Sequence, residues 1–273
     1  MSGSGADMPD PAARFAYRVL GDQPGIPLVL LASLGSSMDD WDAAITNGLA
    51  QKHRVILFDN KGVGGSTGEA PATIAGMAED AVAFIRAMGF AKVNLMGFSM
   101  GGFITQQILL TEPGLVNKVI LTGTGPKGSE GLSDLPKIIA STANLTPEET
   151  FLTFGFTRSE ASLRAGKASY ERIQRRKTDR DKPLNQQAAG AQLAAVLAWA
   201  KPYPDALNEL KTIPQPVLLV QGKNDVPVPV ANAVNASHSI PNARLVVYPD
   251  AGHAAFCQYA EEFVKEANNF LGE

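Results

Sequence analysis

The sequence predicts an α/β fold in which a mostly parallel sheet is flanked by helices. Two observations predict it: short apolar runs recur along the 273-residue chain, and amphipathic stretches separate them. Parallel strands need long connections, and helices usually supply them. A third observation, a long central interval without strand-like runs, adds an inserted helical cap to this plan. The length suits one large domain with such an elaboration.

Six runs are predicted to be strands buried on both faces, because they are rich in large apolar residues and end at turn residues. They cover residues 27–32, 54–59, 92–97, 116–123, 216–222 and 243–250. After the second run, apolar residues from Ile74 to Met88 recur every three or four positions, and Gly89 follows. This spacing predicts an amphipathic helix that ends at the glycine. Similar spacing from Phe256 to Phe270 predicts a final helix.

The alternation stops between about Pro126 and Pro204. We expect a helical cap at residues 127–204, inserted between core segments 1–126 and 205–273. A cap of this kind predicts a closed pocket for small substrates.

Local signals within this interval support helices. Thr146 is a candidate N-cap, Pro147 suits the first helical position and Glu149 closes a capping box. The segment at residues 171–182, ERIQRRKTDRDK, mixes basic and acidic residues, so we interpret it as a solvated helix face rather than an anion-recognition patch.

The composition argues against strongly charged partners. With 24 Lys and Arg, 27 Asp and Glu and a net charge of −3, the chain favours neither nucleic acid nor an anionic membrane. No stretch approaches the roughly 18 apolar residues of a membrane span, and the N-terminus lacks a signal-peptide pattern. We therefore expect a cytoplasmic protein with a loosely ordered first dozen residues. Cys257, the single cysteine, is expected to be a buried structural thiol.

The stretch NLMGFSMGGFI, residues 94–104, holds a serine between glycines where a predicted strand meets a helix. Gly97-Phe98-Ser99-Met100-Gly101 fits the G-x-S-x-G nucleophile elbow, which requires this strand-to-helix context. The sharp turn brings the two backbones together, so a side chain at Gly97 or Gly101 would clash. Ser99 is therefore a candidate nucleophile at the carboxyl end of the sheet.

A serine nucleophile needs a nearby base, and the chain has three histidines. His53 precedes a strand, at the opposite end of the sheet from Ser99, and His238 lies in a helical stretch. His253 follows the last predicted strand, at the same sheet end as Ser99. Asp225, just past the strand at residues 216–222, is the candidate carboxylate that orients the imidazole.

With these motifs the chain resembles the α/β-hydrolase family, over essentially its whole length. The resemblance implies an eight-stranded sheet with a cap after the sixth strand. It also implies an oxyanion hole formed by the backbone N–H groups of Leu34 and Met100. The Ser33-Leu34-Gly35 sequence is similar to the loop of bacterial enol-lactone hydrolases. The stretch at residues 58–67, FDNKGVGGST, is similar to a family loop but has Lys61 where arginine is usual, and it receives no catalytic role.

The predicted chemistry is hydrolysis of a small-molecule carboxylic ester or lactone through an acyl-enzyme on Ser99. His253 acts as general base, Asp225 orients it, and no metal or organic cofactor is required. Hydrolysis of carbon–carbon bonds, perhydrolysis and a ligand receptor with little turnover remain alternatives on the same fold. A dinucleotide-binding oxidoreductase is disfavoured, because no Gly-x-Gly-x-x-Gly follows the first predicted strand.

Overall fold

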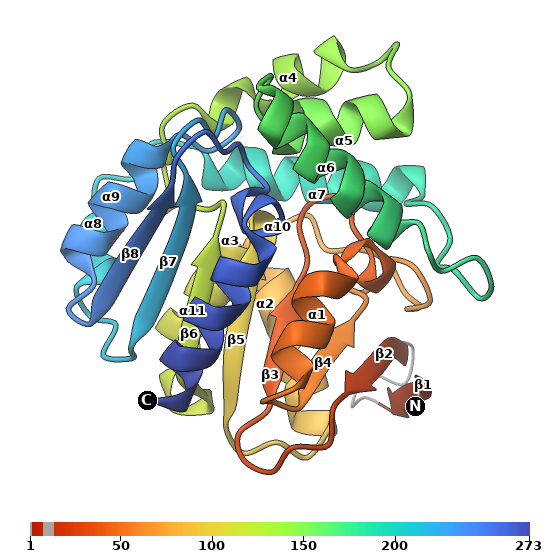
Figure 1. The fold of residues 1–273 in the computed structure, drawn as a ribbon. Coiled ribbons are helices and arrows are strands. Elements are labelled where there is room, and N and C mark those ends of the chain that lie inside the picture. The colour runs from red at the N-terminus through yellow and green to blue at the C-terminus, as the bar shows by residue number, and fades with distance from the viewer. Residues whose placement is uncertain (1, 8–13) are drawn as a thin grey trace.

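The computed structural model describes residues 2–7 and 14–273, and a mixed sheet runs through its centre (Figure 1). The order of its eight strands is β1-β2-β4-β3-β5-β6-β7-β8. The two pairs that involve β2 are antiparallel, and all pairs from β4 to β8 are parallel. The strands are β1 Ser2–Asp7, β2 Arg14–Leu20, β3 Leu28–Leu31, β4 Val55–Phe58, β5 Val93–Phe98, β6 Val116–Thr122, β7 Val217–Gly222 and β8 Ala243–Tyr248.

Helices cover both faces of the sheet because the buried strands alternate their side chains between two apolar layers. Leu28 and Leu30 of β3 pack on the side of α1 and α11, whereas Val29 and Leu31 pack on the side of α2 and α3. The core helices are α1 Ala43–Ala50, α2 Ile74–Ala87, α3 Met100–Thr111, α8 Ala206–Leu210, α9 Val230–Ser239, α10 Ala255–Gln258 and α11 Ala260–Gly272; short 3₁₀ turns are η1 Met38–Asp40 and η2 Pro113–Leu115.

Between β6 and β7 the chain forms helices that lie over the carboxyl ends of the parallel strands (Figure 1). The capping box predicted at Thr146 and Glu149 is confirmed: each side chain accepts a hydrogen bond from the backbone N–H of the other residue. These elements are η3 Leu132–Asp134, α4 Leu135–Ser141, α5 Pro147–Gly155, α6 Glu160–Ile173 and α7 Gln186–Trp199.

The α/β fold is confirmed and all six predicted runs form strands, although β8, at the edge of the sheet, is only partly buried. The N-terminal region differs from the expectation. Residues 2–7 form β1, paired with β2, so the expectation of a loosely ordered start is wrong there. Residues 1 and 8–13, which the same expectation covered, lie outside the described residues. The predicted final helix is interrupted at Tyr259, whose φ of −106° and ψ of 46° are not helical.

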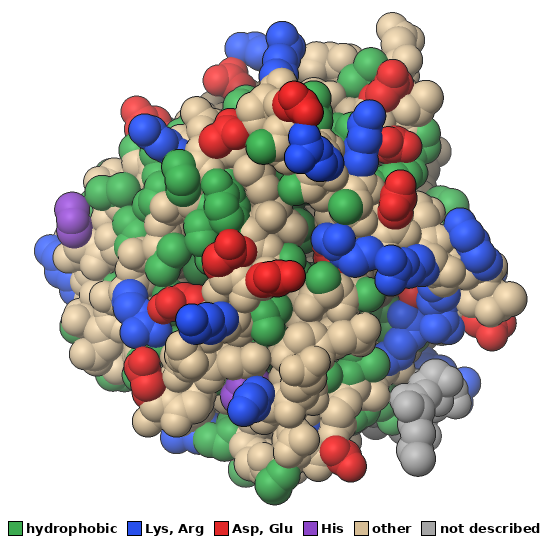
Figure 2. Space-filling model, in the orientation of Figure 1, with side chains coloured by type: hydrophobic (Ala, Val, Ile, Leu, Met, Phe, Trp, Pro, Cys, Tyr) green, Lys and Arg blue, Asp and Glu red, His purple; other side chains and the backbone are tan. Residues whose placement is uncertain are grey.

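The charged segment at residues 171–182 is not a solvated helix face. Helix α6 ends at Ile173, and the following loop carries the remaining charges. Basic side chains gather on this side of the molecule (Figure 2). Several turn inward: Arg176 pairs with Asp39 at 3.4 Å and Arg180 with Asp40 at 3.3 Å. The loop therefore joins the inserted segment to the core instead of facing only water.

A buried ion pair adds to this connection. The side chain of Asp42 has no exposed surface and accepts hydrogen bonds at 2.7 Å from Nε and Nη2 of Arg172. The hydroxyl of Ser169 donates to the same carboxylate at 2.6 Å, and Ala44 N donates at 2.9 Å. Helix α6 is thereby fixed to the N-terminus of α1.

Substituting Arg172→Leu should lower the free energy of unfolding by about 3–5 kcal/mol, because it leaves the buried Asp42 carboxylate without its countercharge. Urea denaturation measures this change. Arg164→Ala is the matched control on the same helix, since Arg164 pairs with Glu160 on the surface and its loss should cost less than about 1 kcal/mol. Equal effects of the two substitutions would contradict this account.

Candidate active site

Ser99 occupies a sharp turn between β5 and α3, and its backbone has a φ of 54° and a ψ of −117°. A non-glycine residue in such a conformation costs on the order of 1–3 kcal/mol. The predicted need for glycine on both sides is confirmed. A Cβ at Gly97 would lie 2.5 Å from the carbonyl oxygen of Gly101, and a Cβ at Gly101 would collide with the carbonyl of Leu31.

His253 and Asp225 form a buried pair on the loops that follow β8 and β7. The Nδ1 of His253 lies 2.8 Å from Oδ2 of Asp225. The carboxylate also accepts hydrogen bonds from Val228 N at 2.9 Å and from Gln221 Nε2 at 2.8 Å. Gln221, the second-last residue of β7, holds the aspartate in place. The sequence analysis did not identify this residue.

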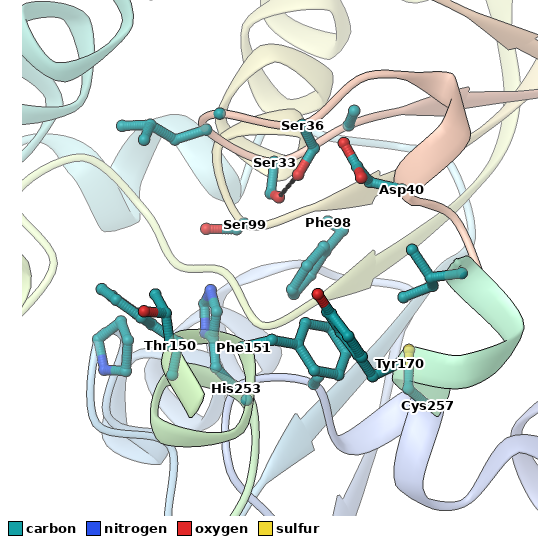
Figure 3. A pocket seen from close by; sticks show the side chains of 18 of the residues that line it. Ser33, Ser36, Asp40, Phe98, Ser99, Thr150, Phe151, Tyr170, His253 and Cys257 are labelled. Carbon is teal, nitrogen blue, oxygen red and sulfur yellow. Dashed lines mark hydrogen bonds between the residues drawn. The ribbon is translucent and has the colours of Figure 1, made fainter. Parts of the chain in front are cut away.

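Ser99 and His253 line one cavity of about 670 Å³ beneath the inserted helices (Figure 3). Space for the imidazole is made by Gly123 at the end of β6, where a Cβ would lie 3.2 Å from Cε1 of His253. The ring of Phe98 packs against the imidazole with centroids 5.0 Å apart. The structure thus brings together the three residues that the sequence analysis selected from separate loops.

Leu34 also lines this cavity, and Met100 is the first residue of α3, directly after Ser99. The N–H of a first helical residue has no partner within its helix and points out of the helix end. A second predicted donor, the N–H of Leu34, belongs to the loop that follows β3. This loop is held from outside: Gly35 N donates to Oε1 of Gln192, on α7, at 2.8 Å.

His53, His238, Trp199 and Cys257 occupy other positions. His238 is exposed on α9, and neither it nor His53 lines the cavity. Burial lowers the pKa of His53, so it stays uncharged more readily than an exposed histidine. Trp199 is a core residue that stacks on Phe103 with centroids 5.3 Å apart. Cys257 is buried, as predicted, and its sulfur lies at the cavity wall, where burial raises its pKa.

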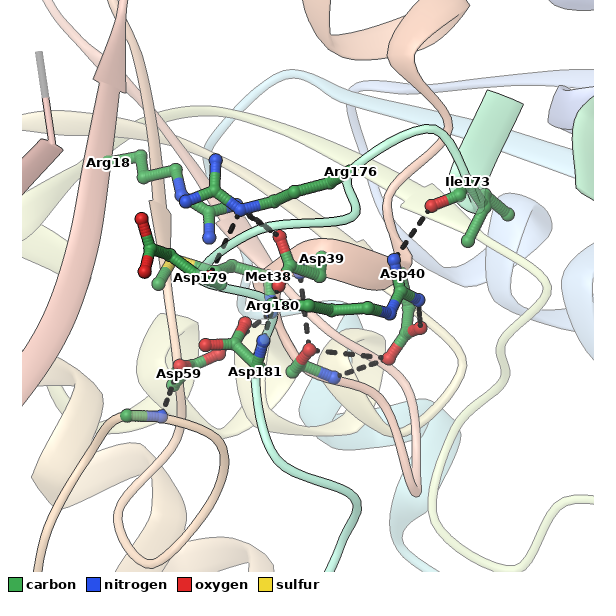
Figure 4. A network of polar contacts seen from close by, with 12 residues as sticks. Arg18, Met38, Asp39, Asp40, Asp59, Ile173, Arg176, Asp179, Arg180 and Asp181 are labelled. Atoms are coloured by element: carbon green, nitrogen blue, oxygen red, sulfur yellow. Dashed lines mark hydrogen bonds and ion pairs between the residues drawn. The ribbon is translucent and has the colours of Figure 1, made fainter. Parts of the chain in front are cut away.

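A cluster of carboxylates lies behind the loop that carries Leu34 (Figure 4). Asp59 is buried and accepts hydrogen bonds from Met38 N at 2.7 Å and Gly65 N at 2.9 Å. Burial, with a smaller contribution from Asp181 beside it, raises the pKa of Asp59 to about 7. Asp181 N donates at 2.6 Å to Asp39. These contacts hold residues 38–40 in position.

The described residues contain no cluster of three or more His, Cys, Asp or Glu side chains suited to a metal ion. Among the helices of the described chain, none has the length and apolar character needed to cross a bilayer.

Comparisons with known proteins identify the fold and family of this chain. A model of the alpha/beta hydrolase fold matches residues 26–258. The structure of an alpha/beta hydrolase fold protein from Chitinophaga pinensis has a TM-score of 0.94 and 39% identity, covering 99% of this chain and 98% of that chain. A pimeloyl-acyl-carrier-protein methyl ester esterase from Aeromonas hydrophila is 27% identical, covering 91% of this chain and 96% of its own. The enol-lactonase from Burkholderia xenovorans LB400 has a similar fold, with a TM-score of 0.77, 21% identity and coverage of 98% and 100%.

Substituting Gln192→Leu should lower kcat for p-nitrophenyl ester hydrolysis by about 10–100-fold with a smaller change in KM, because the loop bearing the Leu34 N–H loses its tether. Steady-state kinetics measures both constants. Gln192→Glu is the matched control: it keeps an acceptor oxygen of the same reach and should retain more of kcat. A Gln192→Leu protein with the parent kcat would show that this tether does not position the donor.

Proposed function

The chain belongs to the α/β-hydrolase fold family and is a hydrolase, and from this premise we propose that it cleaves carboxylic esters or lactones of small substrates with Ser99 as nucleophile. The resemblance inferred from the elbow motif is thereby confirmed at the level of the family. The observation that carries the proposal is the buried His253–Asp225 pair, which faces the same cavity as the strained Ser99. The fold alone would not justify it, because one fold can carry many activities.

In the proposed mechanism, His253 removes the proton from the Ser99 hydroxyl as the oxygen attacks the acyl carbonyl. Asp225 orients the imidazole through Nδ1 and stabilises the imidazolium that forms. The imidazolium then protonates the leaving alcohol, and the acyl group stays on Ser99. Water, activated by the same histidine, attacks the acyl-enzyme and releases the acid.

The backbone N–H groups of Leu34 and Met100 are the proposed oxyanion donors. Loss of one such donor typically costs about 2.7–4 kcal/mol of transition-state stabilisation. Met100 N stands at the N-terminus of α3, where the helix dipole also favours negative charge. Strain at Ser99 contributes by holding the hydroxyl above the sheet, close to this helix end.

We propose that residues 127–204 act as a cap over a core of residues 1–126 and 205–273. The helices of this insertion supply Leu135, Ile139, Phe154 and Val196 to the cavity wall. A cavity of about 670 Å³ is within the range of small-molecule sites, which supports a small ester or lactone rather than a triglyceride. The named activity of the esterase from Aeromonas hydrophila supports ester chemistry.

Substituting Ser99→Ala should abolish p-nitrophenyl butyrate hydrolysis and covalent labelling by a fluorophosphonate, while the fold persists because glycines and backbone set the elbow. Mass spectrometry of the labelled protein and circular dichroism measure the two properties. Labelling that persists in the alanine variant would place the nucleophile elsewhere.

The three histidines provide an internal comparison. His253→Gln should remove turnover, whereas His53→Gln and His238→Gln should leave kcat/KM nearly unchanged, because only His253 faces the cavity. Asp225→Asn should be intermediate: an equivalent change in a serine protease lowers kcat by about 10⁴. Kinetics alongside thermal unfolding separates catalysis from stability. Loss of activity in a fully folded His53→Gln or His238→Gln protein would refute the proposed triad.

A further inference from the structure

The charge of the cavity wall limits which substrates the cavity can hold. Among the described residues that line it, Asp40 and Asp42 are the acidic side chains, and neither lysine nor arginine takes part. The remaining wall carries no charged acid, lysine or arginine among the described residues, and α4, α5, α7 and the loop after β7 contribute apolar and aromatic side chains to it. A negatively charged substrate group would therefore have no cationic side chain to pair with among these lining residues.

Asp42 has no capacity left for a ligand. Its carboxylate is fully enclosed and already accepts from Arg172, Ser169 and Ala44 N. The guanidinium of Arg172 donates to this carboxylate and does not line the cavity. Arg172 therefore offers no positive charge to the cavity.

Asp40 remains partly exposed, with 38% of its side-chain surface accessible. Its Oδ2 accepts from Ser37 N at 2.8 Å, and its Oδ1 lies 3.3 Å from Nη2 of Arg180. Arg180 also donates through Nη1 to the carbonyl of Ile173 at 2.9 Å, which directs it along the outer loop (Figure 4). The carboxylate thus lines the cavity, whereas Arg180, which pairs with it, does not.

A substrate carboxylate in this cavity would exchange water for apolar wall and an acidic neighbour. Burying an unpaired charge costs several kcal/mol, and like charges in a low-dielectric site add to that cost. The N-terminus of α3 favours negative charge only within its first turn, where the reacting carbonyl lies. It cannot compensate a carboxylate at the far end of a substrate.

On these grounds, we propose that this site accepts uncharged esters or lactones and excludes substrates that carry a carboxylate or phosphate away from the reacting carbonyl. The inference rests on the proposed function and specifies the substrate class for the same cavity. Asp40 is its specificity-determining residue.

The test uses two ligands that differ only in charge: methyl adipamate, with a terminal carboxamide, and monomethyl adipate, with a terminal carboxylate. Binding to the Ser99→Ala protein is measured by titration calorimetry at pH 7.5. We expect the carboxylate to bind at least about 30-fold more weakly, which corresponds to roughly 2 kcal/mol. Equal affinity, tighter binding of the carboxylate, or failure of both to bind would overturn the inference. Absence of ester turnover in the parent protein would instead refute the proposed function. The binding titration does not depend on turnover, so the two failures can be told apart.

Two further variants assign the effect to the cavity wall. Asp40→Asn should reduce the difference in affinity between the two ligands by about fivefold, because it removes the partly exposed acidic side chain that lines the cavity. Asp134→Asn is the matched control: it removes one acidic charge from an exposed position outside the cavity and should change nothing. Leu145→Lys places a cation at a lining position that is 39% exposed, and it should improve carboxylate binding. If the ratio of the two ligand affinities stays unchanged in both Asp40→Asn and Leu145→Lys, the role given to the cavity wall is overturned.

Discussion

The close approach of α3 to β3 is the constraint on which the site depends. Gly101 fits against the carbonyl of Leu31, and this contact leaves Ser99 no relaxed backbone conformation. Four hydrogen bonds hold the turn: Ser99 N donates to Thr122 O, while Gly102 N, Phe103 N and Thr124 Oγ1 donate to Ser99 O. The same contact places the N-terminal end of α3 beside the loop after β3. One backbone contact therefore places the proposed nucleophile and both proposed oxyanion donors.

Local sequence patterns predicted the parts of this molecule that local geometry determines. Buried parallel strands are continuous apolar runs, and the elbow requires glycines at fixed offsets, so both could be recognised without coordinates. Strand β2, which lies between β1 and β4, was missed because most of its residues are only partly buried and give no continuous apolar run. The pairing of Arg172 with Asp42 and of Gln192 with Gly35 was also missed, since 130 and 157 positions separate these partners.

Charge in this protein serves attachment more than recognition. Arginines of α6 and the loop after it are paired with acids of residues 39–42, so the insertion is held to the core through its polar edge. Its apolar side remains free to form the cavity roof. Pairing within the protein leaves the described lining of the cavity without a lysine or arginine, although basic side chains are plentiful nearby. The composition of residues 171–182 alone could not reveal this, because it does not specify which way each side chain points.

The separation of partners along the chain also affects when the site can exist during synthesis. A ribosome delivers Ser99 and the loop of Leu34 early, but Gln192, Asp225 and His253 emerge long afterwards. Contacts between distant segments form late in folding, because the intervening chain must first be ordered. A nascent or partly folded chain would expose the serine without its base and without a tethered loop. Under the proposed mechanism, reactivity therefore starts only when the last strand has joined the sheet.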